Sequence, residues 1–74
     1  MSYRPFVDRF VGAVGIVEEF IPANREGSGV VQVAGQLWSA VTDEKQGIEM
    51  GVVVLILERR RTQLIVMPLP PEPR

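Results

Sequence analysis

Four arginines are the side chains in this sequence best suited to bind a charged ligand. A guanidinium binds carboxylates and phosphates through charge-assisted hydrogen bonds. We predict that residues 23–28 and 58–61 form loops, and in a small β-barrel such loops often frame one ligand face. A glutamate lies in each loop, so a solvated charged tip is the alternative interpretation. The candidate anion-binding residues are Arg25, Arg59, Arg60 and Arg61.

The remaining polar residues do not form a catalytic constellation. Histidine and cysteine are absent, which removes the usual general base, the commonest metal ligands and any disulfide framework. Glu18 and Glu19 are adjacent in a predicted strand and therefore point to opposite faces. Asp43 and Glu44 lack the pattern of a calcium loop. We therefore predict no enzyme activity, no catalytic residues, no metal site and no cofactor.

Length and composition are typical of one small globular domain. The chain has 74 residues, of which 46% are hydrophobic and 23% charged, with a formal net charge of −1. This balance produces no overall attraction to nucleic acid or anionic lipid. The longest apolar run, residues 52–57, has the length of a strand, whereas a membrane helix needs about 20 residues. We expect the chain as given to be soluble.

Short β-rich segments separated by turn residues predict an all-β fold. The expected strands cover residues 12–21, 30–33, 36–42, 52–57 and 62–67, with a tight turn at Ala34 and Gly35. Five such strands without a long helix favour a small five-stranded OB-fold-like barrel, with an SH3-like barrel as the alternative. We divide the chain into an N-terminal arm (1–11), the barrel domain (12–68) and a Pro-rich tail (69–74).

Trp38 is the only tryptophan. In an OB fold an exposed aromatic side chain can stack on a nucleic-acid base. The alternative, which we favour, is that Trp38 closes one end of the barrel core. Three of the five aromatic residues lie in the first ten positions, so few are left on the strands for a stacking surface.

Alternation along the last two strands predicts an apolar patch on the outside of the barrel. If Val54 and Ile56 point inward, their neighbours on the same strand point outward. The same rule applies to the neighbours of Leu64 and Val66. Such a patch is typical of a protein interface, unless the N-terminal arm with Phe6, Val7 and Phe10 covers it. The predicted interface residues are Val53, Leu55, Leu57, Ile65 and Met67.

The order of these motifs resembles the C-terminal soluble domain of the NfeD family. The resemblance runs from about Gly12 to Pro68. It rests on Gly12-x-x-Gly15, Gly29-x-Val31-x-Val33-x-Gly35-x-x-Trp38-x-Ala40, Ile48-x-x-Gly51, Val54-x-Ile56 and Leu64-x-Val66-x-Pro68. The transmembrane segments of a typical short member are absent, and the loop after Pro22 is longer than usual in the family.

The resemblance implies an OB-fold barrel that acts as a non-enzymatic interaction domain. It implies stomatin-like or flotillin-like protein partners, and a role in membrane protein quality control or in regulating membrane protease activity. It also implies that the domain faces water on a membrane-anchored parent protein; a cytoplasmic location is the alternative. Self-association is a further expectation from the apolar patch. The competing hypothesis is a module that binds nucleic acid or another anion through the loops between strands one and two and strands four and five.

Overall fold

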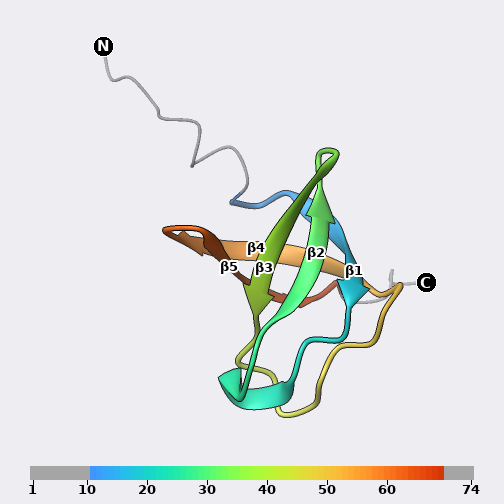
Figure 1. Cartoon of the computed structure of the whole chain (residues 1–74), viewed down its shortest axis with the longest axis vertical. Coiled ribbons are helices and arrows are strands. Elements are labelled where there is room, and N and C mark those ends of the chain that lie inside the picture. The colour runs from blue at the N-terminus through green and yellow to red at the C-terminus, as the bar shows by residue number, and fades with distance from the viewer. Residues whose placement is uncertain (1–10, 70–74) are drawn as a thin grey trace, which may run out of the picture.

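A computed structural model describes residues 11–69 (Figure 1). The predicted arm, with Phe6, Val7 and Phe10, lies almost wholly outside these residues, as does most of the predicted tail. The chain forms β1 (Val14–Glu19), a short 3-10 turn η2 (Ala23–Arg25), β2 (Gly29–Val33), β3 (Gln36–Val41), β4 (Val53–Arg60) and β5 (Gln63–Pro68).

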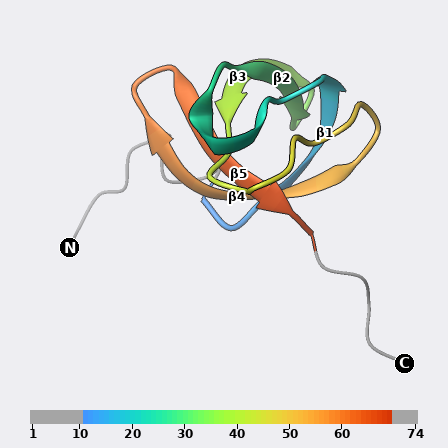
Figure 2. The same cartoon turned by 90° about the horizontal axis from the view of Figure 1, so that it is seen from below.

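The strands close into a barrel in the order β1-β2-β3-β5-β4 (Figures 1 and 2). Neighbouring strands are antiparallel except β3 and β5, which run parallel. Closure leaves few unpaired strand edges, which would otherwise be sites of aggregation. The predicted five-stranded OB-fold-like barrel is therefore confirmed.

Alternation along β2 and the first part of β4 builds much of the core. Val31 and Val33 are buried while Gln32 between them is exposed, because successive side chains of a strand point to opposite faces. Val54 and Ile56 of β4 are buried in the same way, at 0% and 1% exposure. Trp38 packs against this core from its margin. This packing supports the core interpretation of Trp38, whereas closure of one end of the barrel by Trp38 stays a prediction.

The β2–β3 hairpin turns through two residues. Ala34 and Gly35 both have positive φ, 51° and 79°, as a two-residue type I′ turn requires. The right-handed twist of the strands favours this turn type. The tight turn predicted at these residues is confirmed.

Gly15 lies at a close approach of β1 and β2. A Cβ atom at this position would meet the carbonyl oxygen of Gln32 and a methyl carbon of Val33, both at 2.8 Å. Only glycine therefore fits between β1 and β2 here. The structure thus shows why β1 carries a glycine at this position.

A long connection between β3 and β4 closes one end of the barrel. This segment, residues 42–52, lies beside η2 at that end (Figure 2), with a bridge between Ile21 and Ile48. Thr42 is fully buried; its hydroxyl donates a hydrogen bond to the Val66 carbonyl at 2.8 Å and accepts one from the Glu44 amide at 3.2 Å. This hydroxyl therefore ties the start of the segment to β5.

The β4–β5 hairpin differs from the prediction. Residues 58–61 were expected to form its loop, but β4 continues to Arg60 and the turn falls at Arg61, whose φ is 56°. A bulge interrupts the ladder: Ile56 pairs with Val66, and Glu58 already pairs with Ile65. The extra β4 residue reverses the faces of all residues that follow it.

Candidate functional site

The outer face of β4 carries the most exposed apolar side chains of the predicted interface. Val53 and Leu57 have exposures of 41% and 45%, and Leu55 between them is half-buried. Their inward neighbours Val54 and Ile56 are buried in the core. The alternation that the prediction assumed for this part of β4 is therefore present.

The apolar surface extends onto β1, which the sequence analysis did not include. Val14 pairs with Leu55 and Ile16 pairs with Val53 across the β1–β4 ladder. Directly paired residues point to the same face of a sheet, and Val14 and Ile16 are 51% and 45% exposed. The signal was available: both alternate with the buried Gly15 and Val17. It was missed because nothing in the sequence says that β1 is the neighbour of β4.

On the other side of β4, the strand β5 adds to the same surface. Met67 pairs with Leu55, and the Leu69 amide donates a hydrogen bond to the Val53 carbonyl at 2.9 Å. Met67 is half-buried and Leu69 is 41% exposed. Leu55 thus lies in the middle of an outer patch. We define the outer patch as Val14, Ile16, Val53, Leu55, Leu57, Met67 and Leu69.

Ile65 does not belong to the outer patch. It alternates with the buried Leu64 and Val66 as expected, but it is itself only 4% exposed. Val41 of β3 and Glu58 of β4 flank it in the sheet. The bulge places a second β4 residue opposite Ile65, which a regular ladder would not do. The predicted exposure of Ile65 is therefore wrong.

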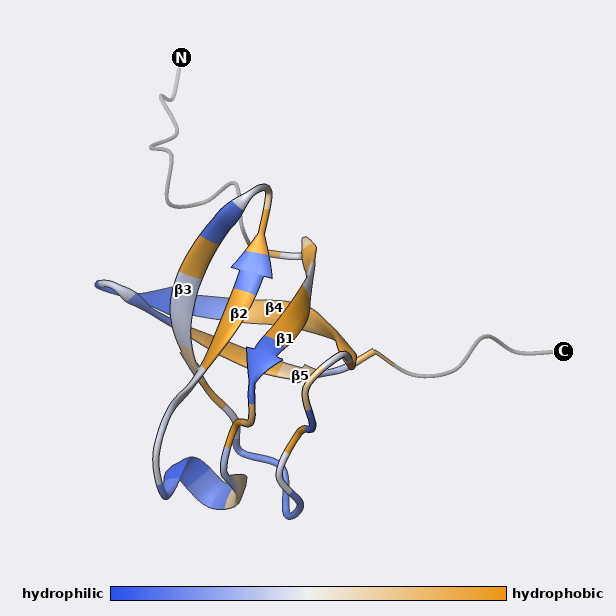
Figure 3. Cartoon of the chain, turned by 45° about the vertical axis from the view of Figure 1, so that its right-hand side comes forward, coloured by the Kyte–Doolittle hydropathy of each residue, from blue (hydrophilic) through white to orange (hydrophobic). Residues whose placement is uncertain are grey.

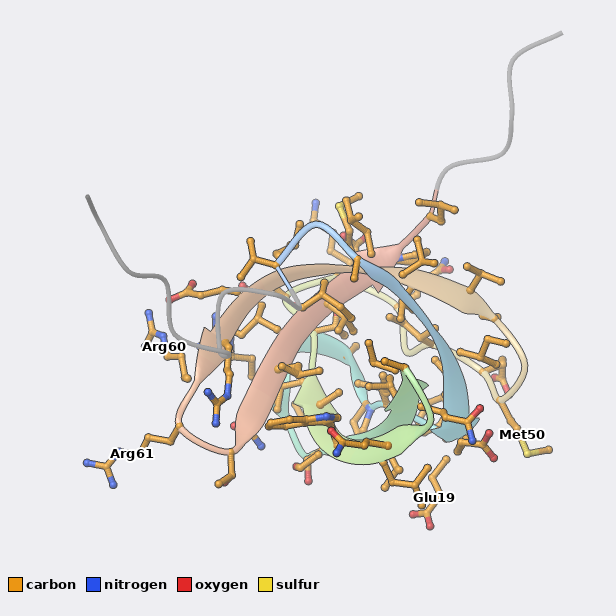
Figure 4. All side chains as sticks on the ribbon, turned by 90° about the horizontal axis from the view of Figure 1, so that it is seen from above. Glu19, Met50, Arg60 and Arg61 are labelled. Carbon is orange, nitrogen blue, oxygen red and sulfur yellow. The ribbon has the colours of Figure 1, made fainter. Side chains whose placement is uncertain are left out.

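Hydropathy is unevenly distributed along the barrel (Figure 3). Along β4 it changes from apolar, where the strand crosses β1, to hydrophilic at the hairpin with β5. The hydrophilic end carries the arginines, and Figure 4 shows Arg60 and Arg61 extending from that hairpin, far from Glu19 and Met50. The outer patch and the arginine-bearing hairpin are therefore adjacent but chemically distinct.

The four predicted anion-binding arginines have four different environments. Arg25 is paired with Asp43, with Nε 2.6 Å from Oδ1 and Nη2 3.0 Å from Oδ2. This hydrogen-bonded pair lowers the pKa of Asp43 and raises that of Arg25. Both side chains are exposed, so solvent weakens the interaction. Arg25 is therefore already partnered by a carboxylate.

The three consecutive arginines do not form one cluster. The Arg60 Nε donates a hydrogen bond to the Glu58 Oε2 at 2.9 Å. Arg61 occupies the exposed turn. Arg59 points to the other face of β4, where its guanidinium carbon lies 4.9 Å from the centre of the Trp38 ring. Neighbours in sequence are thus separated in space because strand geometry replaces the predicted loop.

Residues 11–69 contain neither a metal-binding cluster nor a membrane-spanning helix. No group of three or more histidine, cysteine, aspartate or glutamate side chains could hold a metal ion in this part of the chain. None of its helices has the length and hydropathy needed to cross a membrane.

The sequence matches one protein-family model. This is the NfeD model, described as the NfeD-like C-terminal, partner-binding domain, and it covers residues 7–68. A search of curated protein sequences returned no match.

Three solved structures share the fold. The C-terminal domain of stomatin operon partner protein 1510-C from Pyrococcus horikoshii has 26% identity and a TM-score of 0.76, over 92% of this chain and 100% of that one. The second structure is the soluble domain of a membrane protein implicated in regulation of membrane protease activity, from Corynebacterium glutamicum. It has 27% identity and a TM-score of 0.73, over 82% of this chain and 94% of that one. The soluble domain of the NfeD protein YuaF from Bacillus subtilis has 30% identity and a TM-score of 0.75, over 88% of this chain and 80% of that one.

Proposed function

This chain belongs to the NfeD family, whose matching model describes a C-terminal, partner-binding domain, and we propose that it binds a protein partner through the outer patch and has no enzyme activity. The observation that carries this proposal is the row of apolar side chains across β1, β4 and β5. The proposed domain limits remain those expected from the sequence, with residues 12–68 as the binding unit.

The outer patch has the composition of the centre of an interface. Its seven members are all apolar, and the residues beside it, Gln32 next to Ile16 and Glu58 next to Leu57, are polar and exposed. An apolar centre within a polar rim is the usual arrangement at protein interfaces. Burial of such a surface releases about 25 cal/mol per Å² before the costs of association. Contiguous exposed apolar patches commonly mark contact sites.

The nature of the partner is proposed from the solved relatives. One is described as a stomatin operon partner protein, and another as the soluble domain of a membrane protein implicated in regulation of membrane protease activity. We therefore propose a stomatin-like protein as the partner, with a flotillin-like protein as the related possibility. The domain would face water beside a membrane, attached through a parent chain or through the partner itself.

A single charge in the centre of the outer patch tests this proposal. Leu55→Glu places a carboxylate between Val14 and Met67, its two cross-strand neighbours. Because a buried unpaired charge is unfavourable, affinity for a stomatin-like protein of the same organism should fall about tenfold or more in isothermal titration calorimetry. The outward direction of Leu55 predicts that the barrel stays folded.

Leu37→Glu is the matched control. Leu37 is 65% exposed on β3, and the polar Gln32 of β2 lies between it and Ile16 of the outer patch. This variant should bind within about twofold of the unmodified protein, since exposed residues outside an interface contribute little. A folded Leu55→Glu variant with unchanged affinity would refute the assignment of the surface. Equal losses in both variants would refute it as well.

A further inference from the structure

Arg59 is an unusual cation among the described residues. Its side chain is half-buried, and its Nε atom is shielded from solvent without a hydrogen-bond acceptor in the part of the chain that the structure describes. No carboxylate among residues 11–69 pairs with it. Buried polar groups in folded proteins nearly always have a partner, so the Nε atom is unusual. Because Nε is shielded, a ligand would have to approach this half-buried guanidinium through its terminal nitrogen atoms.

The β4 bulge is what places Arg59 in this position. Without the extra residue, alternation from the inward Ile56 would turn Glu58 inward and Arg59 outward. With the bulge, Arg59 pairs with Leu64, a fully buried residue, and shares its face. The guanidinium then lies against Trp38 at the margin of the core. Bulges often re-aim a side chain at a functional site.

The stack with Trp38 prepares Arg59 for a planar ligand. A guanidinium against an indole face gains cation–π attraction and loses rotational freedom. Its N–H donors lie in the guanidinium plane, in the fork geometry that matches a carboxylate. A preordered donor loses less entropy on binding than a mobile surface side chain.

The neighbouring arginines indicate how many negative charges the site would accept. Arg25 and Arg60 are already paired with Asp43 and Glu58. Only Arg59 and Arg61 of the four candidates remain without an intramolecular carboxylate in residues 11–69. A nucleic-acid strand requires a track of cations along its phosphates. The arrangement instead suits one carboxylate.

We propose that Arg59, held by Trp38, binds a single acidic side chain of the protein partner. This proposal rests on the proposed function, because the ligand is part of a protein partner. It adds a second contact, between Arg59 and a carboxylate, to the apolar contact at the outer patch. Leu57 of the outer patch and Arg59 are two positions apart on β4, but because of the bulge they point to opposite faces of the strand. The acidic side chain should therefore come from a part of the partner other than the segment that covers the outer patch.

A peptide titration followed by ¹⁵N NMR tests this contact. The probe is a capped peptide of alternating leucine and glutamate, and its control has glutamine in place of glutamate. We expect the Arg59 Nε–Hε signal to shift and saturate with the glutamate peptide, and to stay in place with the glutamine peptide. An unresponsive Arg59 signal with the glutamate peptide would overturn the proposal.

Two conservative variants separate a fork-shaped contact from simple charge attraction. Arg59→Lys keeps the charge but loses the planar fork, so affinity for the glutamate peptide should fall about tenfold. Arg60→Lys, the matched control, should bind within about twofold, because exposed charges contribute little. Equal weakening in both variants would contradict the proposal. The unmodified protein already supplies the direct readout, so a folding defect in either variant leaves the test intact.

A third titration uses oligothymidylate. A larger Arg59 shift with this probe than with the glutamate peptide, lost at high salt, would replace the carboxylate by a nucleic-acid phosphate. If the glutamate peptide binds and oligothymidylate leaves the Arg59 signal unchanged, the result supports a carboxylate as the ligand. These outcomes are independent of the Leu55→Glu experiment, because no partner protein is present. Failure of the outer patch and failure of the Arg59 site can therefore be distinguished.

Discussion

Thr42→Val should destabilise the barrel although it hardly changes the volume of the side chain. Thr42 is fully buried, and its hydroxyl contacts two backbone groups, the Val66 carbonyl at 2.8 Å and the Glu44 amide at 3.2 Å. The substitution removes both hydrogen bonds and leaves the two backbone groups without this partner. A buried group left in that state costs about 1–3 kcal/mol. The Glu44 amide is only partly buried, so water can replace one of the two bonds.

We therefore expect a loss of about 2 kcal/mol in the free energy of unfolding. In a domain of this size, each kcal/mol lowers Tm by about 4–8 °C, so the expected decrease is roughly 8–16 °C. Thermal unfolding followed by circular dichroism measures it. Urea unfolding at constant temperature gives the free energy directly, provided that the m-value is unchanged.

Two controls isolate the hydroxyl. Thr42→Ser keeps the oxygen and removes one methyl group, which should cost about 1 kcal/mol. Thr62→Val makes the same chemical change at an exposed position, where changes normally stay within about 0.5 kcal/mol. The reasoning is refuted if Thr42→Val is as stable as the unmodified protein, or if Thr42→Ser is the less stable of the two Thr42 variants.

Three further predictions concern individual positions. Gly15→Ala should lower the unfolding free energy by about 2 kcal/mol or more in urea, because a Cβ atom would meet the β2 backbone at 2.8 Å; unchanged stability would contradict this close approach. Ala34→Asn should raise Tm by a few degrees, since asparagine tolerates the positive φ of this turn better than alanine; a lower Tm would argue against the turn type. The hydrogen bond from Arg25 keeps the pKa of Asp43 below its ordinary value. The Arg25–Asp43 pair therefore stabilises the fold at pH values above the ordinary pKa of an aspartate. This stabilisation is lost as the pH falls through the lowered pKa of Asp43. Arg25→Gln should raise the Asp43 pKa in an NMR titration of the carboxyl carbon; an unchanged pKa would refute the pairing.

Most of the barrel could be predicted from local patterns. Alternation places Val31 and Val33 on one face of their strand, and Ala34-Gly35 indicates the hairpin turn; both features depend on neighbours in sequence. The five-stranded barrel followed from the number and spacing of such segments. These features need no knowledge of which strands become neighbours.

The errors concern the way in which strands pair with one another. The β4 bulge lies within a run of apolar and charged residues that contains no glycine or proline, so the sequence had no signal for it. Alternation carried through the bulge would assign Arg59 to the wrong face. The same bulge lies opposite Ile65, whose exposure was overestimated. One inserted residue thus accounts for the altered arginine arrangement and coincides with the buried Ile65.

The candidate surface was incomplete for a related reason. Val14 and Ile16 alternate correctly in the sequence, but their contribution depends on the β1–β4 ladder that closes the barrel. The alternation of inward and outward residues along one strand does not reveal which distant strand becomes its neighbour. The residues on β4 were predicted because they lie on one strand, whereas the full outer patch requires three.

Methyl-selective NMR of the complex with a stomatin-like protein tests the outer patch most directly. Signals of isotope-labelled valine, leucine and isoleucine methyl groups would be compared between the free and the bound domain. We expect the largest changes at Val14, Ile16 and Leu55, and little change at Leu37, which is exposed outside the patch. Changes centred on Leu37, with the methyl groups of β1 and β4 unaffected, would contradict the proposed binding surface.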